Sequence, residues 1–504
     1  MSFLLGSLSF LIRIRYHTYV MFEFIIGGLV AISFATAYLT NPFSRLSIIK
    51  LPFRIKLDRQ VHETIDNSAK LKVKNQWYWR WFAMYQSALY ILTTRYFHSP
   101  ASNSKTVDSI IADIHALRYD PNKLLLISGD HFNGLFVRNL GVFYYPLLDP
   151  SIESTEQDWQ DRQTVYLQTV AYALGVFTKS PRLTTTIVSM GPMAATCVNY
   201  YAYPSDSLFG ILYTLAVLRG EQSAAALHYN PKAHTLDTKT AAGHLLRDYH
   251  DTLVLLYDDY KNTVLDSATG LIAKSVHLSG AKDITRRRSA FYDNVVYWKT
   301  TQLAMTLGII PTDTAYLKRL KRQIIDTFWL EDKGYFLEDL SDEGVSRGYY
   351  SSDWLIVLST GFLDPLGSKE SVYYTRSIAY IQKHKIDRPF ALKYQQDTRA
   401  HRQFLPVRLA VASYGGDAIW SFWGMEYIKA LTLLYKKTGD ASYKKAAKYH
   451  IEKYEQKMVE YGGFPEVYDP DGKLLQTPFY RSIRQTGWVI GFEQARAMYD
   501  ALCN

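Results

Sequence analysis

Hydrophobic residues recur at intervals of three and four along most of the chain after residue 70, the spacing that places them on one face of an α-helix. Strict alternation of apolar and polar residues, which indicates a strand, is short and scarce, and residues 124–128 are its best example. The pattern predicts about twelve helices, near residues 73–97, 106–118, 160–178, 205–219, 241–259, 289–307, 313–328, 351–361, 369–384, 416–437, 441–459 and 483–501.

These helices have no internal sequence repeat of the kind that builds an open solenoid. Their connecting loops carry Gly, Pro, Asp and Asn. We therefore expect an all-α fold of paired helices, with a closed ring of helical hairpins as the natural arrangement.

The beginning of the chain has a different pattern. Residues 19–39 form an apolar stretch with a single charge, Glu23, which is long enough to cross a bilayer as a helix. No small-residue cleavage site follows it, so we predict an uncleaved anchor rather than a signal peptide; the alternative is a buried helix of a soluble domain. The predicted organisation is an N-terminal segment with the anchor (1–40), a basic juxtamembrane linker (41–70) and one catalytic domain (71–504).

Charge suggests how such an anchor would be oriented. Two arginines precede the apolar stretch and five basic residues follow it, so the positive-inside rule favours the cytoplasmic side for the bulk of the chain. The whole chain has a net charge of +10. Without a nucleic-acid-binding motif or a long basic tail, this charge fits attraction to an anionic membrane better than nucleic-acid binding.

Composition and motifs exclude several kinds of chemistry. The chain has two cysteines, far apart, which makes a disulfide framework or a cysteine metal site improbable. It has no His-x-x-x-His or Glu-x-x-His motif, no Gly-x-Ser-x-Gly motif and no phosphate- or dinucleotide-binding glycine pattern. We expect neither a metal nor an organic cofactor. The 40 Tyr, 24 Phe and 10 Trp suit both a packed helical core and a carbohydrate cleft.

Candidate chemistry is concentrated in four loops, at residues 128–141, 277–299, 413–427 and 461–495. They combine carboxylates with aromatic residues and glycines. Glycoside hydrolysis needs two carboxyl groups, one that protonates the leaving oxygen and one that activates water or attacks carbon. Burial against aromatic rings would raise the pKa of the acid and keep it protonated.

Several of these segments resemble motifs of the six-hairpin α/α-toroid glycoside hydrolases, especially glycoside hydrolase family 63 and the trehalase-like family. Ser279–Asp283, followed by Arg286, is similar to the segment that carries the general acid. Tyr414–Trp420 is similar to a motif that lines the sugar site. Phe464–Pro470 is similar to the segment that carries the general base, and it is followed, as in the family, by the pair Gly487–Trp488.

The resemblance implies a fold and an activity. The fold is an α/α toroid of about six helical hairpins, and the activity is that of an inverting, exo-acting α-glycosidase on an α-linked glucoside or related oligosaccharide. Asp283 would be the general acid and Glu466 the general base, with their carboxyl groups about 6.5–9.5 Å apart. The implied substrate-binding residues are Asp130, His131, Arg138, Asn139, Arg286, Tyr414, Asp417, Trp420, Tyr468 and Trp488.

Each candidate also has a simpler interpretation. Asp283 could cap a helix that starts near Thr285, and Asp206 could start the helix that follows it. Asp417, a second candidate for the acid, could cap a helix beginning at Ala418. Glu466 could be a solvated loop residue.

Two rival functions remain open. An epimerase on the same ring would transfer protons with histidines, which requires His131, His277 and His401 to converge. A non-catalytic glycan-binding protein is favoured by two departures from the family pattern. Lys282 stands beside the acid and would favour its ionised form, and Asn139 replaces a carboxylate.

Overall fold

We analysed a computed structural model of the chain, which describes residues 71–97, 101–118, 134–141, 156–189, 194–199, 202–220, 238–282 and 284–503. Several predictions lie outside these residues: the anchor at 19–39, the linker at 41–70, the strand at 124–128, and the site residues Asp130, His131 and Asp283. Among the described helices, none is both long and apolar enough to cross a bilayer.

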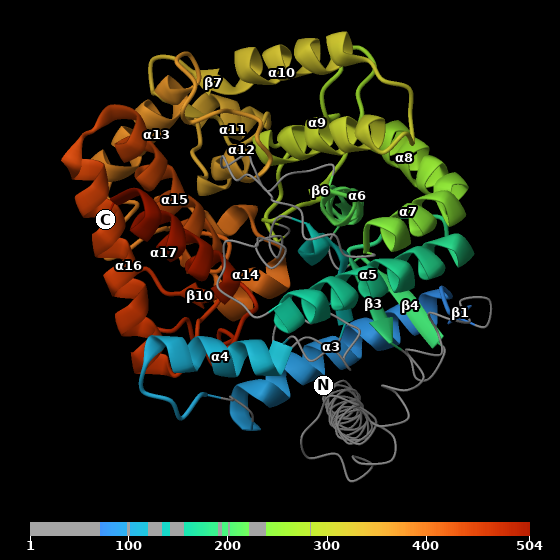
Figure 1. The fold of residues 1–504 in the computed structure, drawn as a ribbon, viewed down its shortest axis with the longest axis horizontal. Coiled ribbons are helices and arrows are strands. Elements are labelled where there is room, and N and C mark those ends of the chain that lie inside the picture. The colour runs from blue at the N-terminus through green and yellow to red at the C-terminus, as the bar shows by residue number, and fades with distance from the viewer. Residues whose placement is uncertain are drawn as a thin grey trace, which may run out of the picture.

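The described part of the chain is mostly helical, as predicted (Figure 1). Most predicted helices are present within a few residues of their expected ends. The helices are α3 (Trp77–Phe97), α4 (Val107–Arg118), α5 (Glu156–Lys179), α6 (Ser207–Leu218), α7 (Thr238–Asp248), α8 (His250–Val264), α9 (Phe291–Thr306), α10 (Thr314–Phe328), α11 (Asp342–Arg347), α12 (Ile356–Ser359), α13 (Ser371–Lys383), α14 (Leu405–Val411), α15 (Ser421–Thr438), α16 (Ala441–Tyr461) and α17 (Val489–Cys503), with 3-10 turns η2 (Val137–Leu140), η5 (Ser352–Leu355) and η6 (Ala400–Arg402).

Wholly buried helices alternate along the chain with helices that bury one face. Fourteen of the sixteen residues of α9 are buried, against three of the fifteen of α10. Fourteen of the eighteen residues of α15 are buried, against five of the twenty-one of α16. Figure 1 shows the same order in space, with α10, α13 and α16 at the periphery and α9, α15 and α17 inside them. This inner and outer pairing is what a ring of helical hairpins requires.

The hairpin α15–α16 shows how sequence sets one such pair. Gly439 ends α15 with a positive φ of 71°, a conformation that glycine adopts at little cost. Asp440 then caps α16, because its carboxylate accepts the backbone N–H of Ser442 at 2.8 Å. His115 of α4 bonds Glu493 of α17 at 2.6 Å, so a helix near the start of the described chain meets the last one. One continuous apolar core runs through these elements.

Strands are more numerous than the sequence analysis expected. A four-stranded sheet, in the order β1 (Lys72–Val73), β4 (Ala194–Val198), β3 (Thr186–Ser189), β2 (Gly134–Phe136), lies beside α3 and α5. Here β1 runs parallel to β4 and the other pairs are antiparallel. Three two-stranded ladders complete the list: β5 (Tyr203–Pro204) with β6 (Leu278–Ser279), β7 (Trp329–Leu330) with β8 (Tyr335–Phe336), and β9 (Ile419–Trp420) with β10 (Val467–Tyr468).

Several helix boundaries also differ from the prediction. The helix predicted at 416–437 begins only at Ser421, because residues 419–420 pair with β10 instead. The helix predicted at 241–259 is two helices that break at Tyr249, and 351–361 is a 3-10 turn with a single turn of α-helix. The short helices α11 and α14 were not predicted.

Candidate active site

Glu466 is held by backbone bonds on both of its sides. The ladder β9–β10 pairs Val467 with Trp420, directly after the glutamate. The Glu466 N–H donates to the carbonyl of Ile483 at 3.1 Å, and its own carbonyl accepts the N–H of Ser421 at 3.1 Å. The side chain is 5% exposed. Glu466 is therefore buried, and hydrogen bonds fix its backbone. The interpretation as a solvated loop residue is wrong.

Aromatic side chains form a wall beside this carboxylate. The Tyr480 hydroxyl donates to Glu466 Oε2 at 3.2 Å. The Tyr414 ring lies 5.3 Å from Tyr480 and 4.7 Å from Trp420, and Trp488 lies 5.9 Å from Trp420. Burial, with a contribution from the charge of Glu466, raises the pKa of Tyr480 well above its usual value, so the phenol keeps its proton and remains a donor. Three predicted residues, Tyr414, Trp420 and Trp488, are thus brought together with Glu466.

The loop predicted to carry the acid contacts the same wall through the two neighbours of Asp283. The Lys282 ammonium lies 4.8 Å from the ring centre of Tyr394, whose ring is 5.4 Å from that of Trp420. Ile284 packs against Gly415 so closely that a Cβ at Gly415 would meet Ile284 Cδ1 at 2.7 Å. Asp283 itself lies outside the described residues, so the predicted separation of the two carboxyl groups stays a prediction.

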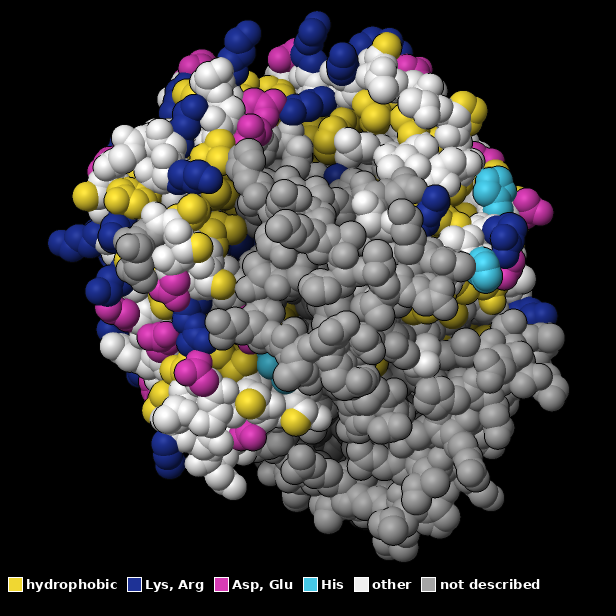
Figure 2. Space-filling view, viewed as in Figure 1, with side chains coloured by type: hydrophobic (Ala, Val, Ile, Leu, Met, Phe, Trp, Pro, Cys, Tyr) yellow, Lys and Arg dark blue, Asp and Glu magenta, His cyan; other side chains and the backbone are white. Residues whose placement is uncertain are grey.

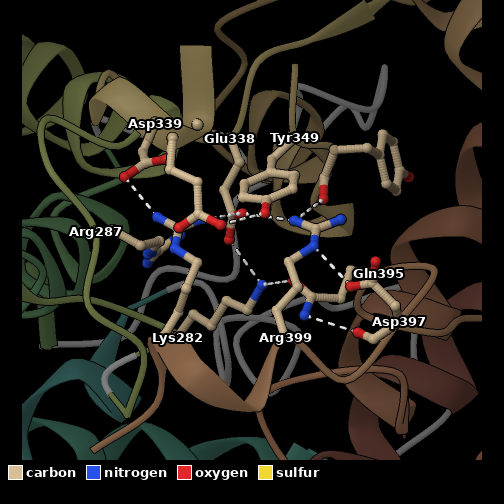
Figure 3. Close-up of polar contacts among 12 residues, drawn as sticks. Lys282, Arg287, Glu338, Asp339, Tyr349, Gln395, Asp397 and Arg399 are labelled. Carbon is tan, nitrogen blue, oxygen red and sulfur yellow. Dashed lines mark hydrogen bonds and ion pairs between the residues drawn. The ribbon is translucent and has the colours of Figure 1, made fainter. Parts of the chain in front are cut away.

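Lys282 belongs to a buried ion network centred on Glu338 (Figure 3). Glu338 accepts from Lys282 Nζ at 2.7 Å, from Arg399 at 2.9 Å and from Arg402 at 3.0 Å. Lys282 also donates to Gln395 Oε1 at 2.5 Å. Burial alone would raise the pKa of Glu338, but the attraction of the three cations outweighs it and holds the pKa well below the usual range. Burial lowers the pKa of Lys282 to about 8, against the opposing pull of Glu338.

Arg138 fixes the turn just before this lysine. It lies on η2 and is buried, and it donates to the carbonyl of Gly280 at 2.5 Å and to Ser279 Oγ at 3.1 Å. Asp206 lies 3.6 Å from the Arg138 guanidinium and accepts the Tyr292 hydroxyl at 3.1 Å. Asp206 therefore supplies a carboxylate to Arg138, the kind of partner that the Arg-Asn sequence lacks at position 139. Asn139 is buried on the same turn.

A second set of buried charges packs beneath the same turn. Arg287 binds Asp353 at 2.5 Å, and Ser205 Oγ donates to Asp293 at 2.7 Å. A Cβ at Gly280 would meet Asp293 Oδ1 at 2.6 Å, so only glycine fits there. Burial raises the pKa of Asp293 to about 6 despite the nearby arginine. The turn Ser279–Gly280 is thus pressed between Arg138 and Asp293, which fixes its position.

The remaining predicted residues lie in other environments. Asp417 is partly buried in the turn before β9, and burial raises the pKa of its carboxyl group. Arg286 is exposed, and its guanidinium lies 5.4 Å from the ring centre of Phe404. Tyr468 is fully buried among core rings, 5.0 Å from Phe390 and 6.2 Å from Tyr454. These contacts are with groups other than Glu466.

The helices expected after Asp283 and Asp417 do not begin where predicted, whereas Asp206 does start the helix that follows it. Among the described residues no helix begins near Thr285, since α9 starts at Phe291 after an N-cap at Ala290. The helix after Asp417 starts at Ser421. Asp206 does occupy the N-cap position of α6, but its side chain makes no capping bond, since it faces Arg138 and Tyr292 instead.

The two described histidines of the rival epimerase mechanism have different partners. His277 Nδ1 lies 3.4 Å from the carbonyl of Arg287, and its ring packs on Phe404. His401 lies at the surface, where Nε2 contacts Glu343 at 2.9 Å. The described positions thus give the epimerase interpretation no histidine pair. In the described part of the chain, no group of three or more His, Cys, Asp or Glu side chains is arranged to hold a metal ion.

Sequence reasoning missed several residues of the site. Tyr480 lies within the stretch 461–495 but was not singled out from its many tyrosines. Glu338, Arg399 and Arg402 follow no local motif, since Glu338 is 61 residues from Arg399. The one available signal was the pair Glu338-Asp339 directly after the aromatic strand β8.

No family model matches the chain, and no curated protein matches it. Solved structures to which it is similar include the following. A glucoamylase from Saccharomycopsis fibuligera is 11% identical, with 81% of this chain and 99% of that chain covered and a TM-score of 0.49. A cellobiose 2-epimerase from Spirochaeta thermophila is 12% identical, with 83% and 98% covered and a TM-score of 0.47. A D-mannose isomerase is 12% identical, with 79% and 98% covered and a TM-score of 0.45.

These three are carbohydrate-active enzymes of the six-hairpin glycosidase fold, and they include both a hydrolase and isomerising enzymes. Their TM-scores are below 0.5 and their identities are 11–12%. The activity of this chain therefore has to be argued from its own residues.

Proposed function

We propose that the chain is an inverting glycoside hydrolase that cleaves an α-linked glucoside or related oligosaccharide, with Glu466 as general base and Asp283 as general acid. One observation carries this proposal. Glu466 is buried on a fixed frame beside the aromatic wall of Tyr480, Tyr414 and Trp420. Aromatic faces suit the apolar faces of sugar rings, and a carboxylate fixed beside them is placed to activate water.

The base needs a fixed direction as well as a fixed position. The Tyr480 hydroxyl donates to Oε2, which orients the carboxylate. A neutral phenol orients Glu466 without adding the positive charge that would weaken it as a base. We therefore assign Tyr480 as a positioning residue for Glu466.

The acid needs protection from the charge of Lys282. The Lys282 ammonium binds Glu338 and Gln395, and so its charge is neutralised by a carboxylate other than Asp283. These contacts of Lys282 support the proposal of an acid at position 283, because a paired ammonium favours the ionised form of a neighbouring carboxyl group less than an unpaired one. Asp417 stays the second candidate for the acid, because burial raises its pKa in the direction that an acid requires.

Attachment to a membrane is part of the proposal. The apolar stretch at 19–39 would anchor the chain, with the catalytic domain on the cytoplasmic side by its flanking charges. The net charge of +10 also favours attachment to an anionic membrane. On the face drawn in Figure 2, lysines and arginines are scattered around the rim rather than gathered in one patch.

The test is the anomer released by the full-length protein in detergent from a panel of α-glucosides and α-mannosides, followed by NMR. The variants are Glu466→Gln, Asp283→Asn and Asp417→Asn, with Glu343→Gln as a surface control. We expect the inverted anomer first, with activity lost in Glu466→Gln and Asp283→Asn and kept in the control. If Asp417→Asn is inactive and Asp283→Asn remains active, Asp417 rather than Asp283 is the general acid.

Other outcomes would replace the proposal. Release of the retained anomer would exclude inversion. Exchange of a sugar C2 proton in heavy water without cleavage would show an epimerase. Binding of glycans with neither reaction would show a binding protein.

A further inference from the structure

The first helix of the described chain exposes a continuous set of large aromatic side chains. On α3, Trp77 is 73% exposed, Trp81 64%, Tyr78 50% and Phe82 37%. These positions are spaced i, i+1, i+4 and i+5, so they share one face of the helix. The rings also contact one another along the helix, with Trp77 packed edge-on against Tyr78 at 6.0 Å.

The opposite face of α3 carries small residues toward the protein. Ala83 is fully buried against Val188 and Val198 of the four-stranded sheet, and Ser87 is buried one turn later. The usual order of a surface helix is therefore inverted here, with the largest apolar side chains outward and the smallest inward. Exposed apolar patches of this kind mark interaction sites in soluble proteins.

The composition of this face indicates a bilayer surface rather than a protein groove. Tryptophan and tyrosine favour the headgroup region, where the ring is sheltered and the N–H or O–H stays wet. Basic side chains precede them in the sequence: Lys72 is exposed, and Lys74 lies 4.3 Å from the ring centre of Trp79. The whole chain is also positive, at +10. An anionic lipid surface complements both the aromatic rings and the charge.

We infer that the N-terminal turns of α3 lie in the interface of an anionic bilayer, with Trp77, Tyr78, Trp81 and Phe82 at the level of the lipid headgroups. Lys72, just before the helix, contacts lipid phosphates. This contact is independent of the proposed hydrolase activity, because it uses none of the residues around Glu466. This contact would set the orientation of the domain on the membrane.

Tryptophan fluorescence can test this contact separately from the predicted anchor. The chain has ten tryptophans, and the first of them in the sequence is Trp77. Lipids that carry bromine quench tryptophan on contact, so the stretch 19–39 contributes nothing to the signal. The full-length protein is reconstituted in vesicles of phosphatidylcholine and phosphatidylserine, with bromine placed either near the headgroup or near the chain end.

We expect quenching by the lipid brominated near the headgroup, weaker quenching by the lipid brominated at the chain end, and weaker quenching without phosphatidylserine. In Trp77→Phe/Trp81→Phe, the quenching should fall by about half or more, because the most exposed described rings are removed while the apolar face is kept. Leu255→Ala, at an exposed apolar residue of α8, should match the wild type.

Two results would overturn the inference. One is the absence of quenching in the wild type, and the other is equal quenching in the double variant. If the wild type is not quenched but sediments as a dimer that Trp77→Ala/Trp81→Ala dissociates, the face binds a second copy of the chain. Thermal unfolding of each variant, unchanged from the wild type, shows that the effect is not a loss of folding.

Discussion

Glu338 and Glu466 are both buried, and the partners described for them differ in charge. Glu338 accepts from Lys282, Arg399 and Arg402, each at 3.0 Å or less. Glu466 accepts from the neutral hydroxyl of Tyr480 at 3.2 Å, beside the ring of Tyr414. Both side chains are nearly inaccessible to solvent. Burial alone therefore does not distinguish a structural carboxylate from a candidate catalytic one.

The hydrogen-bonding partners of the two carboxylates distinguish the structural glutamate from the candidate catalytic one. Three cations hold the pKa of Glu338 well below its usual range, so this group stays ionised and joins the strands and loops that supply the cations. A carboxylate whose pKa is held this low by three cations is a poor base. Glu466 combines a fixed backbone with a hydrogen bond from the Tyr480 phenol and neighbouring aromatic rings, and we propose it as the general base. The comparison predicts that Glu466→Gln lowers the activity and that Glu338→Gln lowers the folding stability.

The largest expected effect is on the activity of Glu466→Gln. Removing a general base costs about 10³-fold in kcat, or roughly 4 kcal/mol of transition-state stabilisation. Folding stability should change by less than about 1 kcal/mol, because the Gln carbonyl can still accept from Tyr480. Initial rates and urea unfolding measure the two quantities. A variant that unfolds easily but retains its kcat would reverse the roles assigned to the two glutamates.

Glu338→Gln should act on stability. It leaves Lys282, Arg399 and Arg402 buried with only part of their counter-charge, which typically costs about 3–5 kcal/mol. Urea unfolding at neutral pH measures this loss. Glu343→Gln is the control, because Glu343 is half-buried near the surface, where it pairs with His401 and accepts the Tyr349 hydroxyl at 2.6 Å, and a Gln carbonyl can still accept from Tyr349. A change within about 0.5 kcal/mol is expected. Equal stabilities for the two variants would show that the network around Glu338 contributes little.

The fold was more predictable than the ladder that positions Glu466. Local periodicity predicted the pair of α9 and α10 closely, because apolar residues recur at intervals of three and four in both, although α9 is buried on nearly all sides and α10 on one face. It failed at residues 416–420, where apolar Ile419 and Trp420 continue the helical pattern but pair with Val467 and Tyr468, almost fifty residues later. A non-local ladder of two residues leaves no periodic signal in the sequence.

The site was predictable only where the motif itself folds as a unit. Tyr414, Trp420 and Glu466 come together because the motifs that contain them form the two strands of one ladder. The network around Glu338 was missed because its members come from three distant loops and no spacing relates them. Tyr468 shows the opposite error: it lies in the matched motif, yet its ring packs in the core against Phe390.

The ion network should also show in the pH dependence of stability. Burial lowers the pKa of Lys282 to about 8 in the folded protein, below its unfolded value. Between pH 8 and the unfolded pKa, the unfolded chain binds more protons, so this group raises the stability as the pH rises. Below pH 8 both states are protonated and the contribution is constant.

Lys282→Met removes this contribution and leaves Glu338 with two arginines. The stability of the wild type relative to the variant should therefore increase by about 2–3 kcal/mol between pH 8 and pH 10. Urea unfolding of both proteins over this range gives the difference directly, and the other lysines and tyrosines cancel from it. Parallel curves would mean that Lys282 titrates normally and is not held in a dry network.

The smallest effect tests the neutral donor of Glu466. Tyr480→Phe keeps the ring beside Tyr414 and removes one hydrogen bond to the carboxylate. A hydrogen bond to a charged group contributes about 1.5–3 kcal/mol at most, so we expect kcat to fall about tenfold with KM nearly unchanged. The acid limb of the pH profile, which the general base Glu466 sets, should also move to higher pH, because the donor that favours the carboxylate is gone. A purely structural role for Tyr480 would lower the thermal stability but leave the pH profile where it is. That shift in the profile therefore separates a positioning residue of the active site from one more buried tyrosine in an aromatic core.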